Sequence, residues 1–139
     1  MEKLVIEKTD YTPLIILDAD SNTFNFSGES RPENALSFYN DAKLWLKKYE
    51  SELLQKNAIG RRACLVVEFK FDYYNSSSAK LIFENLTILD GYHKKQIDTK
   101  IQWYYNEWDE DMKEFGELFS KMLSLPFECL LNQSVKGIS

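Results

Sequence analysis

The sequence predicts one α/β domain, in which a mixed β-sheet is covered by about three amphipathic helices. Short segments of strand character occupy the first part of the chain, and segments with helical and strand periodicity then alternate to its end. At 139 residues, 44% of them hydrophobic, the chain is long and apolar enough to bury one core. We therefore expect a single domain at residues 1–131, followed by a frayed polar tail at residues 132–139.

Three strands are predicted in the first third of the chain. Two are the short apolar runs Leu4–Ile6 and Leu14–Leu17, and the third is the alternating segment Thr23–Phe26. Ser30 and Pro32 then offer a helix cap and an early proline, which predicts the start of a helix.

Three amphipathic helices alternate with strands after this point. Each helix is predicted from apolar residues that recur at intervals of three and four and so share one helical face. The three faces are Ala35, Phe38, Tyr39, Ala42, Trp45, Tyr49 and Leu53; then Ala79, Ile82, Phe83, Leu86 and Leu89; then Trp108, Met112, Phe115, Phe119 and Met122. The second helix is expected to end near Gly91, and the intervening strands are predicted at 63–71, 99–105 and 127–130.

The composition excludes several classes of function. The formal net charge is -5 and the Lys and Arg residues are scattered, whereas a nucleic-acid interface needs them clustered. Apolar runs are too short to span a bilayer, so we expect a cytoplasmic protein with neither nucleic-acid nor membrane partners. Cys64 and Cys129 lack the spacing of metal ligands and are expected to be reduced, buried thiols. No motif implies a cofactor.

The segment Phe71–Lys80 is the most informative about function, because it joins the end of a core strand to the start of the second helix. Its three serine hydroxyls can cap the free backbone N–H groups of that helix. Alternatively, a phosphoryl group on one of them would meet those N–H groups and the positive end of the helix dipole. The residues alone favour capping and leave both interpretations open.

Two catalytic interpretations are weaker. Ser77 and Lys80 have the Ser-x-x-Lys spacing of an acyl-transfer nucleophile, but the other motifs of that enzyme class are missing. Glu107 and the acidic residues 109–111 could form a metal or acid–base site, although carboxylates in the first turn of a helix favour the dipole anyway.

Two further features favour structural roles. His93, the only histidine, is expected in a surface loop. The aromatic cluster of Trp103–Tyr105 and Trp108 is more typical of partial burial in a strand and a helix start than of a partner-binding patch.

Taken together, these segments resemble the SiaC family of bacterial regulatory phosphoproteins over nearly the whole chain. The order and spacing of several motifs agree with the family. They are Thr9 with Thr12-Pro13, Gly28–Asn34, Phe38-Tyr39, Trp45-Leu46 with Tyr49, Tyr74–Lys80, Trp103 with Tyr105, Asp109–Met112 with Gly116-Glu117, and Pro126-Phe127.

The resemblance implies a fold similar to anti-anti-sigma (STAS) domains, phosphorylation by a partner kinase and dephosphorylation by a PP2C-type phosphatase. In the best-known system of the family, the unphosphorylated protein binds and activates a diguanylate cyclase and promotes biofilm formation. The family phosphosite is the residue directly after the Asn of an Asn-Thr-Ser-Ser segment, which here is Ser76. Because Ser replaces the usual Thr, Ser77 and Ser78 remain alternatives.

The resulting hypothesis is a phosphorylation-controlled binding module and not an enzyme. Ser76 would lie on a recognition surface that other residues of the matching motifs line or support, namely Asn75, Ser77, Ser78, Lys80, Glu33, Asn34, Trp103 and Tyr105. The alternative in the same class is an anti-sigma factor antagonist that controls transcription. The enzymatic alternative is a small serine–lysine hydrolase.

Overall fold

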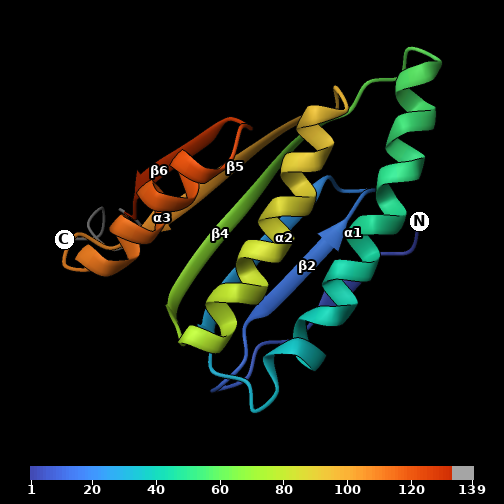
Figure 1. Ribbon diagram of the computed structural model, residues 1–139. Helices are drawn as coiled ribbons and strands as arrows, with labels where there is room; N and C mark the ends of the chain where they lie inside the picture. The colour runs from blue at the N-terminus through green and yellow to red at the C-terminus, as the bar shows by residue number, and fades with distance from the viewer. Residues whose placement is uncertain (133–139) are drawn as a thin grey trace.

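The computed structural model describes residues 1–132, which form one six-stranded sheet with three helices (Figure 1). The strands follow one another across the sheet in chain order. They are β1 (Leu4–Ile6), β2 (Leu14–Asp18), β3 (Thr23–Ser30), β4 (Cys64–Tyr74), β5 (Asp98–Tyr105) and β6 (Phe127–Leu131). The predicted α/β fold with a mixed sheet is confirmed.

The sheet is antiparallel at one edge and parallel over the rest. β1, β2 and β3 form an antiparallel meander, whereas β3 to β6 are parallel. The parallel strands are connected by α1 (Ala35–Ala58), α2 (Ser76–Lys94) and α3 (Glu110–Met122). Because such crossovers are right-handed and all three advance in the same direction, the helices cover the same face of the sheet (Figure 1).

The core lies between this face and the helices. Alternate residues of the central strands point toward the helices and are fully buried, among them Phe26, Phe69 and Trp103. The Phe26 and Phe69 rings stack with centroids 4.7 Å apart, and the centroids of Phe69 and Trp103 are 5.8 Å apart. The opposite face carries a polar row in register across the strands: Asn25, Glu68, Gln102 and Glu128.

Helix α1 begins later than the sequence predicted. Ser30 is the last residue of β3 and is buried, so it does not cap the helix. Asn34 is the cap, and its side-chain oxygen accepts a hydrogen bond from the backbone N–H of Ser37 at 3.1 Å. The prediction was wrong because β3 extends alongside β4 as far as the Ser30–Tyr74 pair. Pairing with a distant strand is invisible in the local sequence.

The ends and faces of α2 and α3 also differ from the predictions. α2 continues past Gly91, so that His93 lies in its last turn and not in a loop. In α3 the buried face is centred on Gly116, because its missing side chain admits the indole of Trp103. Three residues of the predicted apolar stripe are therefore exposed: Trp108, Phe115 and Met122.

Two smaller predictions have different outcomes. Cys64, the first residue of β4, is exposed, so the expectation that both thiols are buried was wrong, and Cys129 is half-buried. Asn132, predicted to begin a frayed tail, donates its backbone N–H to the carbonyl of Tyr105 at 2.7 Å. The rest of the predicted tail, residues 133–139, lies outside the described residues.

Candidate phosphorylation and partner-binding site

The predicted phosphorylation segment lies where β4 ends and α2 begins. Asn75 alone separates the two elements, and its Oδ1 accepts a hydrogen bond from the backbone N–H of Ser78 at 2.9 Å. Its own backbone N–H donates to the carbonyl of Ser30 at 3.1 Å. The helix is therefore capped by Asn75 and not by a serine hydroxyl, which corrects the capping interpretation. The same residue ties the start of α2 to β3.

Ser76 and Ser77 are the first two residues of α2, and both are exposed. The first backbone N–H groups of a helix have no partner within the helix, and the dipole is positive at this end. A phosphate on either hydroxyl would therefore lie at an end of the helix that favours anions. The geometry suits Ser76 and Ser77 equally.

Ser78 differs because its side chain is fully buried. The Ser30 hydroxyl donates to Ser78 Oγ at 2.8 Å, and the Ser78 hydroxyl donates to the Ser30 carbonyl at 3.2 Å. The Tyr39 hydroxyl lies 2.6 Å from Ser30 Oγ. Because Ser30 has already given its one proton to Ser78, Tyr39 is the donor in this pair. Burial also raises the pKa of Tyr39, which keeps its hydroxyl protonated.

These three side chains, Ser30, Tyr39 and Ser78, form a hydroxyl cluster that joins β3, α1 and α2. A kinase cannot reach Ser78 and a partner cannot touch it unless the first turn of α2 opens. The prediction of Ser78 as an alternative phosphoacceptor and contact residue is therefore wrong for the folded chain.

Glu33 and Asn34 lie at the same edge of the sheet as Ser76. Ser30 and Tyr74 are register partners, so the turn that follows β3 is adjacent to the start of α2. Glu33 is exposed and helps to line an open recess of about 460 Å³, and Asn34, the cap of α1, is also exposed. A partner that covers Ser76 can therefore contact both residues.

The remaining predicted contact residues fall into two groups. Lys80 is exposed one turn after Ser76, and Tyr105 is half-buried at the carboxyl end of β5. Trp103 is completely buried, and its indole N–H donates to the carbonyl of Met112 at 3.0 Å. The prediction that Trp103 lines an interface was wrong, although it holds α3 against the sheet and so supports this edge.

The acidic residues around the start of α3 do not form a metal site. No group of side chains among residues 1–132 is arranged to hold a metal ion. Asp109 instead caps α3, since its carboxylate accepts a hydrogen bond from the backbone N–H of Met112 at 3.1 Å. This is the structural role that carboxylates have at a helix N-terminus.

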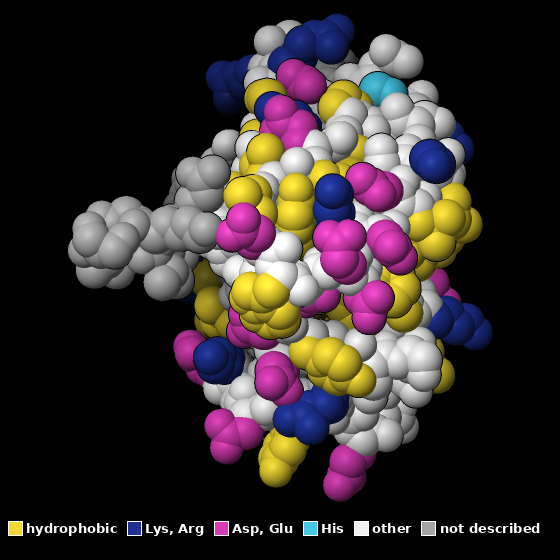
Figure 2. Space-filling model, turned by 90° about the vertical axis from the view of Figure 1, so that its left-hand side faces the viewer, with side chains coloured by type: hydrophobic (Ala, Val, Ile, Leu, Met, Phe, Trp, Pro, Cys, Tyr) yellow, Lys and Arg dark blue, Asp and Glu magenta, His cyan; other side chains and the backbone are white. Residues whose placement is uncertain are grey.

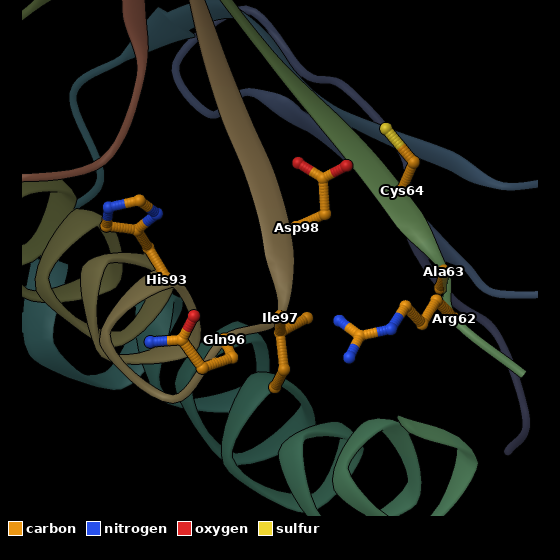
Figure 3. A pocket seen from close by; sticks show the side chains of 7 residues that line it. All are labelled: Arg62, Ala63, Cys64, His93, Gln96, Ile97 and Asp98. Carbon is orange, nitrogen blue, oxygen red and sulfur yellow. The ribbon is translucent and has the colours of Figure 1, made fainter. Parts of the chain in front are cut away.

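A recess of about 420 Å³ lies at the opposite end of the sheet, beside the amino ends of β4 and β5 (Figure 3). His93 and Cys64 lie on either side of β5 in this view. A hydrogen bond with Asp98 raises the pKa of the Cys64 thiol, which disfavours the reactive thiolate. This recess does not belong to the site, because Ser76 follows the carboxyl end of β4.

A family model described as SiaC family regulatory phosphoprotein matches residues 6–131. The chain belongs to the SiaC family. This match runs from the end of β1 through β6 and confirms the resemblance seen in the sequence motifs. An uncharacterised protein of Pseudomonas aeruginosa strain UCBPP-PA14 is 27% identical over 127 residues, which make up 91% of this chain and 94% of that protein.

Solved SiaC structures have the same fold as this family member. SiaC of Pseudomonas aeruginosa has a TM-score of 0.79 at 26% identity, with 95% of this chain and 100% of that chain covered. A chain in the crystal structure of the diguanylate cyclase SiaD in complex with its activator SiaC, from the same organism, has a TM-score of 0.81 at 24% identity, with 93% and 99% covered.

Membership of the SiaC family also bears on the class of function. The family consists of regulatory phosphoproteins, which confirms the prediction of a regulatory protein and not an enzyme. Within residues 1–132, no helix has both the length and the apolar character that a membrane span requires.

Proposed function

We propose that this SiaC family member is a partner-binding module switched by reversible phosphorylation of Ser76. One observation carries the proposal: in a chain from a family of regulatory phosphoproteins, Ser76 is an exposed hydroxyl directly after the Asn75 cap of α2. Ser77 is equally exposed, and the family pattern favours Ser76 because that residue follows the asparagine.

The proposed enzymes of the switch are a partner kinase and a PP2C-type phosphatase. The proposed target of the unphosphorylated protein is a diguanylate cyclase, in the cytoplasm. The support for this target is the likeness to SiaC of Pseudomonas aeruginosa, which is the activator of the diguanylate cyclase SiaD.

The position of Ser76 supports a switch for a physical reason. Phosphorylation would add a charge of roughly -1.5 to -2 at neutral pH. An interface that covers the sheet edge can bury a neutral hydroxyl at small cost, whereas removing a phosphate dianion from water costs several times more. The unmodified protein should therefore bind its target and the phosphorylated protein should not.

The test measures binding of Ser76→Ala and Ser76→Asp variants to a purified diguanylate cyclase from the same organism. Ser76→Ala should bind like the unphosphorylated protein. Ser76→Asp should bind about tenfold or more weakly, which is a loss of about 1.4 kcal/mol or more in binding free energy. Ser77→Ala and Ser77→Asp are matched controls, one residue further along the same exposed turn.

Equal binding by the two Ser76 variants would contradict the proposal. A loss of binding confined to Ser77→Asp would move the switch to Ser77. Phosphopeptide mass spectrometry on protein from its own cells should find the phosphate on Ser76. Co-purification of an anti-sigma kinase, and of no cyclase, would instead support the role of an anti-sigma factor antagonist.

A further inference from the structure

An acidic groove lined by aromatic side chains lies beside the phosphorylation segment. It consists of an open recess of about 540 Å³ and a smaller one of about 100 Å³, which share Tyr73 and Asp109. We call it the β4–α3 groove and define it by Asp72, Tyr73, Tyr74, Trp108, Asp109 and Asp111. Figure 2 looks onto the α3 side of the molecule, where hydrophobic side chains are interspersed with Asp and Glu.

The groove has an excess of negative charge. Arg31 also borders the open recess, but its guanidinium pairs with the carboxylate of Glu29 at 2.8 Å, so these two charges compensate each other. Within residues 1–132, no ion pair is formed by Asp72, Asp109 or Asp111. Three carboxylates that form no ion pair therefore surround the groove and attract a cationic group.

The aromatic side chains of the groove are unusually exposed. Trp108 is 76% exposed and Tyr73 is 49% exposed, although each presents a large apolar ring. Trp and Tyr are common among the residues that contribute most to binding at interfaces. Their ring faces also attract cations, Trp most strongly. The two rings therefore favour the same kind of group as the carboxylates.

Tyr74 supplies an independent sign of a ligand. Its side chain is only 6% exposed, and its hydroxyl is buried with no hydrogen-bond partner among the described residues. It helps to line the smaller recess, together with Asp109 and Asp111. Burial and the charge of Asp109 raise the pKa of this hydroxyl. A donor that enters the recess would satisfy an oxygen that otherwise lacks a partner.

We propose that the β4–α3 groove binds an arginine side chain of the partner protein. A guanidinium is planar, so it can stack on Trp108, and its five N–H donors can serve carboxylates and the Tyr74 oxygen together. A lysine ammonium offers three donors and no flat face. This inference rests on the proposed function, because it assigns the groove to the partner that covers Ser76.

The test uses the full-length unphosphorylated protein and a blocked pentapeptide, acetyl-Gly-Ala-Arg-Ala-Gly-amide. In ¹H–¹⁵N NMR spectra, this peptide should shift the indole N–H of Trp108 and the backbone N–H groups of Tyr73 and Asp109. The same peptide with citrulline, which keeps the shape of arginine without its charge, should bind about tenfold more weakly. The affinity of the same peptide with lysine should lie between the affinities of the arginine and citrulline peptides.

Matched variants test whether binding depends on the carboxylates that line the groove or on any negative charge nearby. Asp109→Asn removes the charge and keeps a residue that caps α3 well. Combined with Asp72→Asn, it should weaken binding of the arginine peptide at least about fivefold. Glu110→Gln is the control, because it removes one charge from the same turn but does not line the groove.

Equal binding of the arginine and citrulline peptides, or no shift of the Trp108 indole at millimolar peptide, would overturn the inference. Undiminished binding by the double variant would do the same. The peptide assay does not involve phosphorylation, so failure here leaves the proposed role of Ser76 standing. Conversely, the arginine peptide could bind while the two Ser76 variants bind a cyclase equally. That result would support arginine binding in the groove and contradict the proposed phosphorylation switch.

Discussion

Ser78→Ala should destabilise the protein, whereas Ser76→Ala and Ser77→Ala should leave its stability nearly unchanged. The fully buried Ser78 hydroxyl accepts the only proton of Ser30 at 2.8 Å and donates to the Ser30 carbonyl at 3.2 Å. Removing the Ser78 hydroxyl leaves the buried Ser30 hydroxyl without an acceptor for its proton, which costs about 1–3 kcal/mol. Alanine recovers about 0.5 kcal/mol of helix propensity, so the net loss is about 0.5–2.5 kcal/mol.

The assay is urea unfolding followed by tryptophan fluorescence, with thermal unfolding as a second measurement. For a chain of this length, a net loss of that size lowers Tm by roughly 2–9 °C. Ser77→Ala is the matched control, because it makes the same chemical change one residue earlier on the exposed side of the turn. Ser30→Ala should cost less in the Ser78→Ala background than in the wild type, because it removes the orphaned donor.

An unchanged unfolding midpoint for Ser78→Ala would refute this account of the hydroxyl cluster. So would equal losses for Ser77→Ala and Ser78→Ala, since only one of these hydroxyls is buried. The same account predicts that Ser78 carries no phosphate in folded protein treated with the kinase, which mass spectrometry can check directly.

Two further predictions concern the packing of α3. Gly116→Ala should lower the free energy of unfolding by about 1–3 kcal/mol in a denaturant titration. A Cβ at this position would lie 2.5 Å from Cδ1 of Trp103 and 3.0 Å from Sγ of Cys129. Lys113→Ala, on the half-buried side of α3, is the control. Asp90→Asn should destabilise the protein at pH 7, because the Asp90 carboxylate accepts hydrogen bonds from the backbone N–H groups of Ser124 and Leu125 at 2.8 and 2.9 Å. Burial alone would raise the pKa of Asp90, but these bonds and Lys94 outweigh it and lower the pKa below 3.8. The stability that the Asp90 carboxylate adds is therefore present above the unfolded-state pKa and is lost as pH falls through the lower folded-state pKa. The difference in stability between Asp90→Asn and the wild type should narrow below about pH 3.8. A difference that is independent of pH would contradict this account.

The elements that the sequence predicted well are those whose signal is local. The apolar residues of α1 and α2 recur with helical spacing, and most of them are buried as expected, among them Tyr39, Leu53 and Leu86. Bounds and faces that depend on other elements were predicted poorly. β3 extends to Ser30 because β4 pairs with it, and α3 turns its Gly116 side inward because Trp103 occupies that space.

The candidate site shows the same difference between local signals and features that depend on other elements. The sequence predicted that residues 71–80 join a core strand to an amphipathic helix, and β4 and α2 meet within this segment, at Asn75. The exposed aromatic residues Tyr73 and Trp108 gave only a weak signal of their own. They lie on different elements, and only the adjacency of the β4 end and the start of α3 places them around one groove.

By itself, the sequence determined the order of strands and helices, the family, and the run of three serines at a helix start. These follow from periodicity, from composition and from motifs that lie within one segment. Only the tertiary structure decided that Ser76 and Ser77 face solvent while Ser78 joins Ser30 and Tyr39 in the core. The physical reason is that exposure depends on what packs against a residue, and the partners of Ser78 are separated from it by 39 and 48 positions in the chain.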